Sequence, residues 1–132
     1  MAKHQRSRND FLVQTVEVLA VKLYVSASLA QIEFTGKMNE PIGKFSEIRV
    51  TVHTDERPDT DPSAAVGFVQ GGRRGLDGAA FFRADMFDRL WMLATTGMLR
   101  RASLTLTKPY RLRARLLHLE CSTDPEPDQP TP

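Results

Sequence analysis

The segment MLRRASLTLTKPYRLRARLLHLEC, residues 98–121, decides the fold class of this chain. Apolar and polar side chains alternate along both of its halves, and alternation with a period of two is typical of a strand with one buried face. We therefore expect Met98 to Thr107 and Tyr110 to Cys121 to pair as an antiparallel hairpin about Lys108-Pro109. The predicted inward set consists of Ala102, Leu104, Leu106, Leu112, Ala114 and Leu116.

The alternation changes phase in the second half of this hairpin. After Leu116, the apolar pattern continues at Leu117 and Leu119, which a regular strand would place on the opposite face. One extra residue in a strand shifts the phase of every residue that follows it. The sequence therefore predicts a β-bulge, or a change of sheet, near Leu117.

Three further strands are expected in the first half of the chain. They are Val16 to Val25, which is dense in β-branched residues, Leu29 to Thr35, and Phe45 to Thr54, which alternates most regularly. Gly36 to Gly43 contains an asparagine and a proline and is predicted to be a turn. The first of these strands is expected to place one set of side chains on a common face, namely Leu19, Val21, Leu23 and Val25.

A second hairpin is expected in the middle of the chain. The segment DERPDTDP, residues 55–62, contains acids and two prolines and is predicted to be an exposed loop. Two short apolar segments follow at 64–70 and 78–83, on either side of GGRRGLDG. The glycines of that segment allow the positive φ angles that hairpin turns require.

The period changes only in DMFDRLWMLATTG, residues 85–97. Apolar residues recur there at helical spacing, with Trp91 among the residues expected in the core. Asp85 is expected to cap the helix through its side chain, and Gly97 to end it in the left-handed conformation. The predicted apolar stripe consists of Met86, Leu90, Leu93 and Gly97, flanked by Phe87, Trp91 and Ala94.

These elements predict one mainly β domain spanning residues 11–121 of the 132. We expect an antiparallel sandwich or partly open barrel of about seven or eight strands, with one short helix at about 85–96 covering an opening or an edge. Residues 1–10 are predicted to be a disordered basic arm, and residues 122–132 a disordered, acidic, proline-rich tail. Every uncharged apolar run is shorter than the ~18 residues of a membrane span, and a cytoplasmic location is expected.

The charge of the chain is balanced overall but unevenly distributed. Eighteen basic and sixteen acidic residues leave a net charge of +2, which does not indicate a dedicated nucleic-acid binder. From Arg89 to Leu119, however, there are basic residues and no acid. Alternate side chains of a strand lie ~7 Å apart on one face, so a row of arginines is expected there. The candidate binding residues for an anion or acidic partner are Arg101, Arg111, Arg113 and Arg115.

Three interpretations of the arginine row remain open at this point. A phosphate backbone could follow it, but no aromatic platform for bases is evident, because Tyr110 is out of phase with the row. Alternatively, the arginines form a solvated face and pair with acids of neighbouring strands. In the third hypothesis, the acidic tail contacts the same strand, from Asp124, Glu126 and Asp128.

Several kinds of chemistry find no support in the sequence. The single cysteine excludes an internal disulfide or a cysteine-based zinc cluster, and the three-residue spacing of His118 and Cys121 on a strand does not suit a catalytic dyad. The acidic loop after His53 matches no known metal-ligand spacing, and no phosphate loop or serine elbow is present. We therefore predict no catalytic residue, no metal and no cofactor.

The function expected from the sequence is a noncatalytic binding or assembly module. Because exposed strand edges favour pairing between copies, we expect it to self-associate as a homo-oligomer. The first alternative is anion or nucleic-acid binding through the basic sheet face, and the second is a small enzyme with an unrecognised site. The expected partners are thus a second copy and an acidic partner or nucleic acid, and no membrane.

Overall fold

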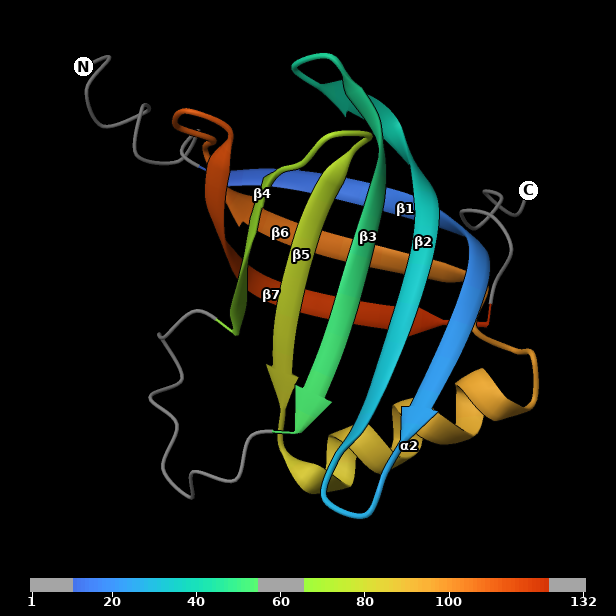
Figure 1. Cartoon of the computed structure of the whole chain (residues 1–132). Helices are drawn as coiled ribbons and strands as arrows, with labels where there is room; N and C mark the ends of the chain where they lie inside the picture. The colour runs from blue at the N-terminus through green and yellow to red at the C-terminus, as the bar shows by residue number, and fades with distance from the viewer. Residues whose placement is uncertain (1–10, 55–65, 124–132) are drawn as a thin grey trace.

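Seven strands close into a barrel, and one helix lies at one of its ends (Figure 1). This computed structural model describes residues 11–54 and 66–123. The expectation of a mainly β fold with one short helix is confirmed, and the barrel is closed, in the order β1-β2-β3-β5-β4-β7-β6. The elements are β1 (Phe11–Val25), β2 (Ala30–Ile42), β3 (Phe45–Thr54), β4 (Gly67–Gly71), β5 (Leu76–Phe82), α2 (Ala84–Thr95), β6 (Arg101–Thr107) and β7 (Arg113–Ser122).

The sheet is mixed rather than purely antiparallel. The predicted hairpin of β4 and β5 forms, and β5 fits between β3 and β4. As a result, β5 runs parallel to β3, whereas every other pair in the barrel is antiparallel. The barrel closes where the first half of β1, Phe11 to Glu17, pairs with β6.

The predicted hairpin of β6 and β7 is present, together with the change of phase near its end. Thr105 pairs with His118, whereas the next residue, Leu106, pairs with Leu116. Leu117 is therefore the extra residue of a β-bulge. Because of this bulge, Leu116 and Leu119 are both buried.

Strand β2 is longer than expected, and the prediction of a turn over Gly36 to Gly43 is wrong. The strand continues to Ile42, and the chain turns only at Gly43, which has a φ of 60°. Gly36 lies inside the strand where β1 passes close by, and a Cβ atom there would be 2.3 Å from the carbonyl oxygen of Glu17. A glycine in a strand can thus mark a close approach of backbones as well as a turn.

Strand β1 buries different residues from those predicted. Gln14 and Val16, in the half that pairs with β6, are buried. The register with β2 shifts between Val18 and Ala20, and beyond that point the strand is largely exposed. The expected common buried face is therefore absent, since Leu19 and Val25 are both exposed.

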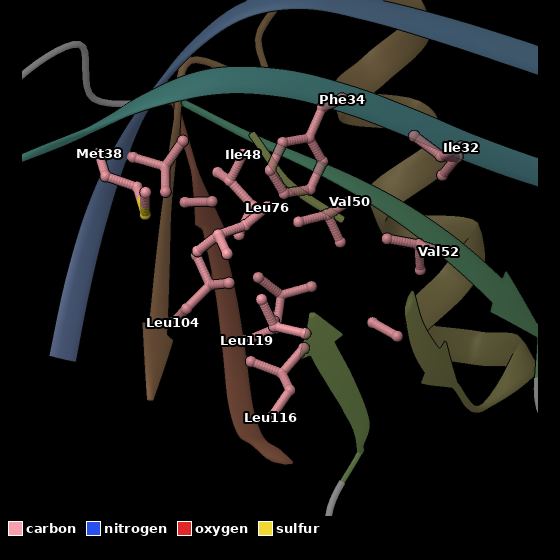
Figure 2. Close-up of a cluster of buried hydrophobic side chains, with 14 of the residues drawn as sticks. Ile32, Phe34, Met38, Ile48, Val50, Val52, Leu76, Leu104, Leu116 and Leu119 are labelled. Atoms are coloured by element: carbon pink, nitrogen blue, oxygen red, sulfur yellow. The ribbon is translucent and has the colours of Figure 1, made fainter. Parts of the chain in front are cut away.

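The core fills the barrel interior with side chains from opposite walls. Figure 2 shows Phe34 of β2, Val50 of β3 and Leu104 of β6 directed toward the same interior space. All three are fully buried, as are Val52 of β3 and both Ala102 and Leu106 of β6. This packing makes the wall of the barrel a rigid support for side chains on its outer surface.

Helix α2 contacts β1, β3 and β5 through the predicted apolar stripe. Leu90 and its flanking residues Phe87 and Ala94 are buried, whereas Met86 is exposed, and Trp91 is half-buried and packs against the core. Asp85 makes no capping bond and instead pairs with Arg83. Gly97 has a φ of 74° and ends the helix as predicted. No helix in the described ranges is long and apolar enough to cross a membrane.

Candidate functional site

Two of the predicted arginines lie side by side on the outer surface of the barrel. Arg113 and Arg115 of β7 are exposed, because the alternation of the strand directs Leu116 into the core. Strand β4 pairs with this part of β7, so that Phe68 lies opposite Arg115 and Gln70 opposite Arg113. Paired residues of neighbouring strands share a face of the sheet. The outer face therefore carries an aromatic ring and an amide beside the two guanidinium groups.

Arg111 lies in the turn that precedes β7. Tyr110 and Arg113 exchange two backbone hydrogen bonds of 2.8 and 3.0 Å, and only Arg111 and Leu112 lie between them. Both have positive φ angles, 53° and 61°, as a two-residue type I′ hairpin requires. Such a turn usually contains asparagine and glycine, because side chains with a Cβ rarely adopt this conformation.

Leu112 anchors this turn to the neighbouring strand. The N–H of Gly71 donates a 2.8 Å hydrogen bond to the carbonyl oxygen of Leu112. The Leu112 side chain packs so closely over Gly71 that a Cβ atom there would be 3.1 Å from it. Leu112 thus remains 43% exposed at the rim instead of joining the core as predicted.

A groove of about 980 Å³ lies along these residues, between β4, β7 and the turn that joins β6 to β7. Its lining contains four basic side chains, two aromatic rings and no acid. The lining residues are Phe68, Val69, Gln70, Thr107, Lys108, Tyr110, Arg111, Arg113, Ala114 and Arg115.

The arginines of the groove make no ion pair with any of the described residues. Among the described residues, ion pairs join Arg49 to Asp77, at 3.0 Å, and Arg83 to Asp85, at 3.1 Å. Asp77 is the acid closest in register, since it pairs with Gln70 across β4 and β5, but its carboxylate binds Arg49. Within the described part of the chain, the arginines of the groove therefore do not pair with acids of neighbouring strands.

Two exposed aromatic rings lie beside the arginines, although the sequence had indicated no aromatic platform there. Phe68 is 48% exposed and Tyr110 is 71% exposed, and both line the groove. The guanidinium carbon of Arg111 lies 5.3 Å from the centre of the Tyr110 ring. Phe68 was missed because it belongs to a strand distant in sequence, although its alternation with buried Val69 does indicate an outward position.

Arg101 does not belong to this group. It begins β6 and pairs with Ser122 at the end of β7, whereas Arg113 begins β7. Nine residues of strand separate Arg113 from Ser122, a distance of roughly 30 Å. The structure thus brings together three of the four predicted binding arginines. The acids of the predicted tail lie outside the described residues, and the described chain leaves β7 at the end remote from Arg113.

The other candidate chemical groups do not converge. Burial, and secondarily the charge of Glu120, raise the pKa of the Cys121 thiol to about 12, and a protonated thiol is a poor nucleophile. His118 is exposed, whereas Cys121 packs against the core. His53 stacks on Phe81 at 5.2 Å, and the acidic loop after it lies outside the described residues. Within the ranges 11–54 and 66–123, no three His, Cys, Asp or Glu residues are placed to hold a metal ion.

The chain was also compared with known proteins. No protein-family model, no curated protein and no solved structure matches it.

Proposed function

We propose that this protein is a noncatalytic binding module that holds a phosphate-bearing polyanion in the groove beside β7. The observation that supports the proposal is the lining itself, in which Lys108, Arg111, Arg113 and Arg115 occur without any acid. Guanidinium groups bind phosphate oxygens through pairs of parallel hydrogen bonds. A polyanion would therefore meet several matched donors and no repelling carboxylate among these residues.

The exposure of these cations determines how the binding should respond to salt. Charges in contact with water are screened within about 8 Å at physiological ionic strength, so each contact is weak and salt-dependent. A polyanion that neutralises several cations releases an equal number of counterions, and the logarithm of the affinity falls linearly with the logarithm of the salt concentration. We thus expect binding at low salt that weakens steeply as salt is added.

The test measures binding of fluorescently labelled inorganic polyphosphate to the full chain at several salt concentrations. Replacing Arg113 and Arg115 by glutamine should weaken binding at least tenfold at low salt and reduce the salt slope by about one unit for each arginine removed. The matched control replaces Arg100 and Arg101, at the other end of the hairpin. An absence of polyphosphate binding, or an equal loss in the control, would refute the proposal.

A second candidate function, self-association, is favoured by the free edge of β1. Pairing of β1 with β6 ends at Glu17, and residues 20–25 pair only with β2 among the described residues. An unpaired strand edge offers backbone donors and acceptors to another strand. The edge is flanked by exposed apolar side chains, namely Leu19, Leu23, Tyr24, Val25 and Leu29. We propose that a second copy of the chain pairs with this edge.

The mass of the protein in solution at micromolar concentration tests this second proposal. Replacing Leu23 and Val25 by lysine places like charges near each other in an antiparallel pair of β1 strands, and a dimer should then dissociate. The control is Val13→Lys, which introduces one lysine at an exposed position in the half of β1 that already pairs with β6. A monomeric parent protein would rule out this candidate.

A further inference from the structure

In the groove, one aromatic ring lies on each side of β7, and the arginines of β7 lie between the two rings. Phe68 lies beside Arg115 on the β4 side of β7, and Tyr110 pairs with Arg113 on the β6 side. Two strand spacings across and two residues along put their backbones roughly 12 Å apart. A ligand that reached from one ring to the other would therefore pass over the arginines between them.

We infer that the ligand is a single-stranded nucleic acid, with bases stacked on Phe68 and Tyr110 and with phosphates bound by Arg113 and Arg115. This inference rests on the proposed polyanion-binding function. Bases stack on exposed aromatic side chains, and a basic groove that follows the phosphate backbone accompanies such rings in proteins that bind single strands. An acidic peptide or a polyphosphate would use the arginines but would not need a ring on the other side of the strand, at Phe68.

The geometry of the surroundings disfavours a duplex. The bases of a duplex are stacked on each other, so that side chains such as Phe68 have no base face to contact. A helix is the element that commonly enters the major groove of DNA, but α2 lies at the other end of β1 from the groove. The groove lies where Phe11 of β1 pairs with Thr107, one of its lining residues.

The chemistry of the lining also limits what can be read from the bases. Gln70 is the only side chain with an amide among the lining residues. The backbone N–H of Arg115 already donates a 2.9 Å hydrogen bond to the hydroxyl of Thr107. Reading of base edges requires several donors and acceptors held in place. We therefore expect binding through stacking and phosphate contacts, with little preference for sequence.

The experiment follows the fluorescence anisotropy of a labelled oligo(dT) of about 12 nucleotides as the full-length protein is added. In parallel, labelled polyphosphate is titrated under the same conditions. Phe68→Leu and Tyr110→Leu each remove a ring while keeping an apolar side chain, and each should weaken oligo(dT) binding about tenfold. Phe68→Leu should leave polyphosphate binding unchanged.

Three further variants make the result specific. Phe68→Tyr keeps the ring and should keep the affinity for oligo(dT). Tyr24→Leu removes an exposed ring of β1 that does not line the groove and should have no effect. Replacing Arg113 and Arg115 by glutamine should weaken the binding of both ligands. Because the replaced side chains are exposed, the circular dichroism spectra of all variants should match that of the parent.

The outcomes distinguish this inference from the function on which it rests. If polyphosphate binds but the ring variants bind oligo(dT) as well as the parent does, the ligand is another polyanion and the inference is refuted. A duplex of the same sequence that competes as well as the single strand would refute it too. If neither labelled ligand binds, both the inference and the proposed function fail.

Discussion

Arg111 has a strained backbone conformation at the rim of the proposed binding groove. Its φ of 53° lies in the left-handed region, which costs a residue with a Cβ roughly 1 to 2 kcal/mol. Strained backbone of this kind is often found at binding sites, where the surrounding structure maintains it. Here the two hydrogen bonds between Tyr110 and Arg113, together with the anchoring of Leu112, keep Arg111 at the rim of the groove.

Arg111→Asn should therefore have opposite effects on stability and on binding. Asparagine adopts the left-handed conformation more readily, so we expect the free energy of unfolding to rise by about 0.5 to 1 kcal/mol. Polyphosphate binding should weaken at the same time, because one of the four cations is lost. Urea denaturation and the anisotropy titration measure the two effects, and a destabilised variant would contradict this interpretation of the turn.

The thiol of Cys121 should be nearly inert in the folded protein. A pKa near 12 leaves very little thiolate at pH 8, whereas the unfolded chain has the ordinary value of 9.0. Alkylation by iodoacetamide should be at least about 100-fold slower in the native state than in denaturant, since the thiolate is the reactive form. Equal rates in the two states would show that the side chain is accessible.

The raised pKa of the Cys121 thiol also makes a contribution to the stability of the fold that depends on pH. The neutral thiol is favoured in the folded state, so this contribution is complete below pH 9 and is lost as the pH rises toward 12. In a Cys121→Ala variant, the fall in stability over this alkaline range should be smaller than in the parent.

At the scale of elements, the bulge in β7 decides which leucines stabilise the barrel. Leu119 is buried because Leu117 is the extra residue, whereas an uninterrupted alternation from Leu116 would bury His118 instead. Leu119→Ala should lower the free energy of unfolding by about 2 to 4 kcal/mol, and Leu117→Ala should lower it by less than about 1 kcal/mol. Chemical denaturation of the two variants tests the register, and the reverse order of the two losses would show that the bulge is misplaced.

Sequence periodicity predicted most of the elements because it reflects local geometry. Strand β3, the β6–β7 hairpin with its bulge, and the left-handed end of the helix at Gly97 were all predicted. The extension of β2 past Gly36 was not, because that glycine is explained by the backbone of Glu17, which is distant in sequence.

For the candidate site, the positions within one strand could be predicted from the sequence, but the neighbours from other strands could not. The alternation of β7 placed Arg113 and Arg115 together on the outer face. The addition of Phe68, and the separation of Arg101 from the others, depend on which strands pair across the barrel. Sequence patterns of single strands do not contain that information.

At the scale of the whole molecule, the two proposed surfaces lie at different ends of β1. The groove lies near Phe11, where β1 begins, and the free edge leads up to Val25, beside α2 (Figure 1). Strand β1 has 15 residues and bends around the barrel between these two surfaces. Pairing of two copies through the free edge would therefore leave both grooves open.

Such a dimer should bind long single strands more tightly than short ones. Once one groove is occupied, the second acts on the same strand at a high effective concentration, which can raise the overall affinity by roughly 100- to 10,000-fold. Oligo(dT) of about 60 nucleotides should thus bind better than the 12-nucleotide form by more than the added number of sites explains. In the Leu23→Lys, Val25→Lys variant, this extra gain in affinity should vanish. If the gain persists, it does not arise from pairing of two copies through β1.

The seam between β1 and β6 also has a consequence for how the protein is made. The first described strand, β1, meets β6 only after residues 101–107 have been synthesised. On the ribosome, Phe11 to Glu17 must wait until those residues emerge, and contacts so distant along the chain slow folding generally. Until then, the edge of β1 that later pairs with β6 keeps its backbone donors and acceptors unpaired.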